Sequence, residues 1–76
     1  MMAESDDLER RLLAAHDLGD LRALAGLYAE ASERAEATGQ RDRAAFFLTH
    51  AWVFALDAGL ASAEAFRDRL GSWGRC

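Results

Sequence analysis

The hydrophobic and polar positions of the chain fall into four segments in which apolar residues recur every third or fourth place, the period of an amphipathic α-helix. Gly19, Gly39 and Gly59 follow the first three segments and stand twenty residues apart. A glycine just past a helix end takes the left-handed backbone conformation, which other residues adopt only at a steric cost. The pattern therefore predicts an all-α fold of antiparallel helical hairpins, with tight turns at the three glycines.

We expect four helices, over Asp7–Leu18, about Asp20–Thr38, Gln40 or Arg41 to Ala58, and about Ser62–Leu70. Ser5 or Asp6 is expected to cap the first helix, because both side chains accept hydrogen bonds from free backbone amides. The single valine and the lack of an alternating apolar pattern give no sign of β-strands. Residues 1–76 are expected to form a single helical domain, with 1–5 and 72–76 frayed.

The third predicted helix is apolar over an arc on the order of 200°, which is typical of a central helix packed on more than one side. Ala44 and Ala51 lie on its small-residue stripe, and we expect them at the closest contact with the second helix. The opposite stripe carries Phe46, His50 and Val53. This second stripe predicts either a layer covered by the first and fourth helices or a contact with another protein.

Size and charge narrow the possible functions. A 76-residue chain buries little surface on folding, so its stability needs good packing or a second subunit. Its only cysteine, Cys76, allows neither an internal disulfide nor a finger-type zinc site. The formal net charge of −4 argues against nucleic-acid and anionic-membrane partners. No apolar run is long enough to span a bilayer, and the acidic start lacks the layout of a signal peptide. We therefore expect a cytoplasmic location.

From the second helix onward, small and large residues are arranged as in a tetratricopeptide repeat, which the chain resembles over roughly residues 18–60. The positions that carry the resemblance are Tyr28, Ala31, Ser32, Ala35, Gly39, Ala44, Leu48 and Ala51. The closing proline of the family is replaced by Leu56, and the period is forty residues rather than thirty-four. The longer period and the pair Gly19-Asp20 are similar to repeats of large bacterial regulatory proteins. An ordinary antiparallel bundle is the alternative interpretation.

The resemblance implies a right-handed stack of helical hairpins that binds proteins and has no catalytic residues. In the family the first helix of a pair lines the concave face, which here implies a face made of Gly26, Ala29, Glu33 and Glu36. The resemblance thus favours a small non-catalytic protein-interaction module or adaptor.

No residue pattern indicates an enzyme, a cofactor or a metal ion. His16 lies in the last turn of the first helix, where a cation is favoured, and His50 lacks other ligands at metal-binding spacing. Arg34, Arg41 and Arg43 bracket a turn, but the flanking helices are longer than those of a DNA-binding helix-turn-helix.

We expect the chain to bind protein, either itself or a different one, through the side of the third helix. The expected contact residues are Phe46, His50, Val53, Phe54 and Trp73. Aromatic residues are the usual anchors of such contacts. The alternative function is that of a structural homo-oligomer, such as a homodimer, or of a small accessory subunit of a larger complex.

Overall fold

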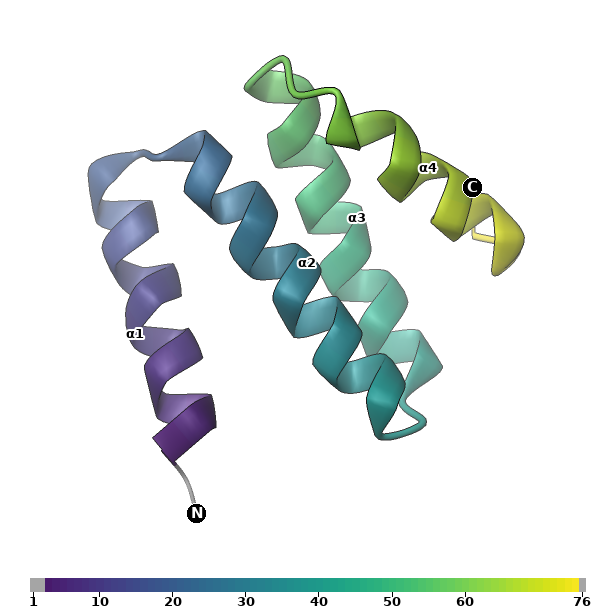
Figure 1. The fold of residues 1–76 in the computed structure, drawn as a ribbon, viewed down its shortest axis with the longest axis horizontal. Helices are drawn as coiled ribbons and strands as arrows, with labels where there is room; N and C mark the ends of the chain where they lie inside the picture. The colour runs from purple at the N-terminus through teal and green to yellow at the C-terminus, as the bar shows by residue number, and fades with distance from the viewer. Residues whose placement is uncertain (1–2, 76) are drawn as a thin grey trace.

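The fold is a flat stack of helices in which each helix packs against its neighbours in the sequence (Figure 1). The computed structural model describes residues 3–75, and the side chains of 7–75. Over this range the elements are α1 (Ala3–Leu18), α2 (Leu21–Ala37), α3 (Arg41–Asp57) and α4 (Ser62–Ser72), with no β-strand. The prediction of an all-α fold with four helices is confirmed.

The three predicted turns share one geometry. Gly19, Gly39 and Gly59 have φ angles of 65°, 77° and 69°, in the left-handed region. In each turn the residue after the glycine donates its backbone amide to a carbonyl five residues earlier, as in a Schellman motif. The bonds are Asp20 to Ala15, Gln40 to Ala35 and Leu60 to Ala55, at 3.0, 2.9 and 2.8 Å.

The helix ends differ from the prediction by more than one residue in two places. Helix α1 already begins at Ala3, so Ser5 and Asp6 lie inside its first turn and the predicted cap is wrong. Helix α4 continues to Ser72, two residues beyond the predicted end at Leu70. Of the segments expected to fray, residues 3–5 and 72 are helical, whereas 1, 2 and 76 lie outside the described residues.

The core lies between α2 and α3 and is built largely from small residues. Ala44 and Ala51, which the sequence places at this contact, are fully buried. The buried hydroxyl of Ser32 donates a 2.8 Å hydrogen bond to the backbone carbonyl of Ala44, so the two helix backbones approach closely here. Short side chains at these positions allow that approach.

Helices α1 and α4 flank the α2–α3 hairpin at its two edges, α1 against α2 and α4 against α3. The slab measures 31 × 30 × 13 Å. Neither flanking helix covers the outer stripe of α3, where Phe46 is 59% exposed and Val53 is 45% exposed. The alternative in which the first and fourth helices wrap α3 completely is therefore wrong.

Candidate functional site

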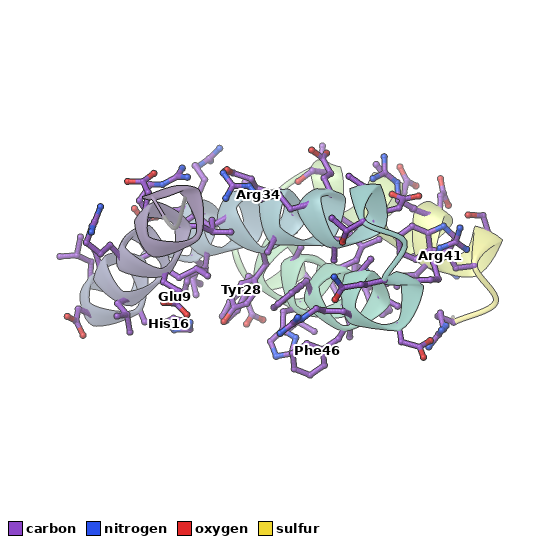
Figure 2. All side chains as sticks on the ribbon, turned by 90° about the horizontal axis from the view of Figure 1, so that it is seen from below. Glu9, His16, Tyr28, Arg34, Arg41 and Phe46 are labelled. Atoms are coloured by element: carbon purple, nitrogen blue, oxygen red, sulfur yellow. The ribbon has the colours of Figure 1, made fainter. Side chains whose placement is uncertain are left out.

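Rings from three helices converge on one broad side of the slab and form a surface that we call the aromatic face. Figure 2 shows His16, Tyr28 and Phe46 projecting toward the same side of the molecule, from α1, α2 and α3. The aromatic face consists of six side chains, His16, Tyr28, Phe46, Phe47, His50 and Phe54.

Tyr28 is the centre of this network. Its ring stacks on Phe54 with centroids 5.7 Å apart, and lies 5.1 Å from the ring of His50. The tyrosine Oη and His16 Nε2 are 3.0 Å apart and share a hydrogen bond. The imidazole of His16 also meets Phe54 edge-on at 6.0 Å. Tyr28 therefore links α1 to α3, whose backbones do not approach each other closely.

Phe46 forms the outer edge of the face. Its ring lies 4.6 Å from His50 and meets Phe47 edge-on at 5.7 Å. His50 Nδ1 donates a 2.9 Å hydrogen bond to the backbone carbonyl of Phe46, which fixes the imidazole on the helix surface. Over half of the Phe46 side chain nevertheless faces solvent. A contiguous exposed aromatic surface on a small protein commonly marks a binding site.

A groove continues the face along the N-terminal half of α3. It has a volume of about 390 Å³ and lies between α1 and α3 above α2. Its walls include Leu8, Leu12 and Phe47, and its charged members are Glu9, Arg34 and Arg43. The guanidinium of Arg43 lies 6.0 Å from the centre of the Phe47 ring. The groove thus joins apolar walls to charges of both signs.

On the opposite side of α2, ion pairs link it to α1. Arg11 donates to both carboxylate oxygens of Glu30, at 3.4 and 3.2 Å, and Arg34 contacts the same carboxylate at 2.6 Å. The hydrogen bond that Arg11 donates to Glu30 raises the pKa of Arg11. The side chains of both pairs are more than a third exposed, so the pairs contribute little to the free energy of unfolding. The Arg11–Glu30 pair orients α1 against α2.

Of the residues expected to bind a partner, the structure gathers Phe46, His50, Val53 and Phe54 on α3. Trp73 lies elsewhere. It packs against the buried cluster that includes Leu70, and Arg41 lies 4.9 Å above its ring. No ring contact joins Trp73 to the aromatic face within the described side chains.

The expected concave face is separate from the aromatic face. Gly26, Glu33 and Glu36 are exposed on α2, and Gly26 borders a shallow hollow beside α1. Ala29 is half-buried and packs against the cluster of Leu48 and its neighbours. These residues lie away from the side on which Tyr28 projects.

Sequence reasoning missed three members of the aromatic face. In the sequence, Tyr28 is a position of the repeat-like pattern, Phe47 belongs to the wide apolar arc of the third helix, and His16 is expected as a helix-end histidine. Phe47 and Phe54 are seven residues apart, which places both rings on one side of α3. This spacing is the local feature of the sequence that indicates part of the aromatic face. Their meeting with Tyr28 and His16 depends on how the helices cross, which the sequence pattern does not define.

Within the described residues, no group of three or more His, Cys, Asp or Glu side chains is placed to hold a metal ion. None of the helices in residues 3–75 has the length and apolar character needed to cross a membrane. No protein-family model matches the chain, and the comparisons with curated proteins and with solved structures give no match.

Proposed function

We propose that the chain is a small, non-catalytic protein-interaction module of tetratricopeptide-repeat-like type that acts as a cytoplasmic adaptor. The aromatic face is its contact surface. The observation that carries this proposal is the exposure of Phe46 and Val53 beside a connected set of rings. An apolar surface of this kind is costly in water, and covering it by another protein gives the exposed rings the role of anchors.

The architecture supports a repeat-like module. Within residues 3–75 the helix backbones approach only those of their sequence neighbours, as the units of a solenoid do. The central hairpin combines a glycine turn at Gly39 with the small buried positions Ser32, Ala44 and Ala51. One hairpin flanked by two further helices is shorter than the usual three-repeat solenoid, so a partner that covers an open face would add to its stability.

A photo-crosslinking experiment tests this function. The photoreactive analogue p-benzoylphenylalanine replaces Phe46, and in a control chain it replaces Glu33, which is exposed on α2 away from the aromatic face. Cells that produce the chain are irradiated, and the adducts are identified by mass spectrometry. We expect one defined protein adduct from position 46 and none from position 33. Equal labelling from both positions, or no protein adduct from position 46, would contradict the proposal.

A further inference from the structure

The outer stripe of α3 carries opposite charges at equal distances from its midpoint. Starting at Arg43, stripe positions follow at intervals of three, four, three and four residues, the spacing of a coiled-coil seam. The members are Arg43, Phe46, His50, Val53 and Asp57. His50 is the midpoint, with Arg43 seven residues before it and Asp57 seven residues after it. All five side chains are exposed or half-buried.

The two terminal charges of this stripe are placed unfavourably for an isolated helix. Arg43 is the third residue of α3, near the positive end of the helix dipole, and Asp57 is its last residue, near the negative end. Neither side chain makes an ion pair with any side chain in residues 7–75. Arg43 donates only a 3.3 Å hydrogen bond to Gln40. The stability of α3 therefore does not account for these charges.

We propose that the aromatic face binds a second copy of this chain, with the two α3 helices antiparallel about a two-fold axis at His50. This inference rests on the proposed function and names its partner. In this arrangement Arg43 faces Asp57 of the second copy, and the reciprocal pair forms by symmetry. The exposed apolar residues Phe46 and Val53 of one copy lie against Val53 and Phe46 of the other, and the His50 side chains lie on either side of the axis.

Self-complementarity is the reason for choosing a second copy. An isologous interface must carry both members of every contact on one patch, at equal distances from its axis. The α3 stripe meets this condition for the charged pair, because Arg43 and Asp57 are both seven residues from His50, and nearly meets it for the apolar pair, because Phe46 and Val53 are four and three residues from it. An antiparallel neighbour also brings the opposite end of its dipole beside each misplaced charge. A broad side of 31 × 30 Å is large enough to contain the roughly 800 Å² that each partner contributes to a standard interface.

Two reciprocal charge variants test the pairing. Arg43→Asp leaves two acidic residues facing each other in a homodimer, and Asp57→Arg leaves two basic ones. We expect the wild type to dimerise by analytical ultracentrifugation, and each variant alone to associate at least about tenfold more weakly. An equimolar mixture restores association as a heterodimer, because each aspartate then faces an arginine.

These variants separate loss of association from loss of fold. Each replacement places its new charge at the end of α3 that the dipole favours, so the monomers should melt at the same temperature as the wild type or higher. A monomeric wild type, or a mixture that associates no better than its components, overturns the proposal. Dimerisation unaffected by either variant overturns it as well.

The position of the axis has its own test. In a Cys76→Ala background, His50→Cys should form a disulfide-linked dimer on mild oxidation, since equivalent residues next to a two-fold axis are close together. Glu33→Cys, exposed on α2 away from the face, is the control and should remain monomeric on reducing-agent-free gels. Equal cross-linking of both variants overturns the register. If the wild type is monomeric but position 46 cross-links to a different protein in cells, the proposed function survives and only the second copy is excluded.

Discussion

Ser32 and Ala44 are joined across the α2–α3 hairpin by a hydrogen bond in which the buried serine hydroxyl donates to the alanine carbonyl at 2.8 Å. Ser32→Ala removes that bond but keeps the helices in close contact, so we expect a loss of about 1 kcal/mol in the free energy of unfolding. Ser32→Leu also overpacks the contact and should cost about 1–3 kcal/mol more. Urea denaturation measures both, with Glu33→Ala as an exposed control that should change little. Equal stability of the two Ser32 variants would show that the contact is not tight.

Alanine in place of Gly26, inside α2, and of Gly39, in the turn that follows, should change the stability of the chain in opposite directions. At both Gly26 and Gly39 an added Cβ meets no atom within 4 Å, so packing contributes nothing to the difference. Gly39 has φ of 77°, and Gly39→Ala should cost about 1 kcal/mol. Gly26 lies inside α2, where Gly26→Ala should stabilise the chain by about 0.5–1 kcal/mol. Thermal melts of the two variants check the pair, and shifts of the same sign would contradict this account.

Ala51 is fully buried in the helix contact, and Ala51→Leu should destabilise the chain by about 1–3 kcal/mol because three extra carbons must be accommodated. The matched control is Ala65→Leu, which makes the same change at an exposed position of α4 and should be neutral. Chemical denaturation followed by circular dichroism compares the two. A tolerated Ala51→Leu would mean that α2 and α3 separate easily.

Phe46→Asp should abolish protein binding through the aromatic face while the chain stays helical, because the side chain is 59% exposed and contributes little to the core. Leu13→Asp is the control, since Leu13 is 66% exposed on the outer edge of α1. Light scattering and circular dichroism report mass and helicity. Unfolding of the Phe46 variant, or an equal effect of the Leu13 variant, would argue against a specific interface.

Much of the fold can be predicted from local features of the sequence, namely the turn glycines and the period of the apolar residues. Gly39 ends a helix because of its own backbone freedom, and Ala51 is buried because of where it stands in a helical period. The cap predicted at Ser5 or Asp6 is wrong because α1 begins before either residue, at Ala3. A polar residue acts as an N-terminal cap only when the residues before it are not helical.

The candidate site is less predictable for a different reason. His16 and Phe54 are far apart in the sequence and meet only because the C-terminal ends of α1 and α3 converge over Tyr28. The sequence predicts Trp73 beside the contact residues of α3, but its ring packs on the cluster that includes Leu70. Both outcomes depend on helix crossing angles, which a pattern of apolar residues constrains only weakly.

The neighbour-only packing of the helices has a consequence for how this surface forms. Contacts that are close in sequence cost little loop-closure entropy, so the α2–α3 hairpin is expected to form early and quickly. The backbone of helix α1 approaches α2 alone, so α1 is expected to open while the hairpin stays intact. Whenever α1 opens, His16 leaves Tyr28, and the face loses one of its three helices. A partner that contacts both α1 and α3 would therefore hold α1 in place, and its binding and the folding of this edge would be a single linked equilibrium.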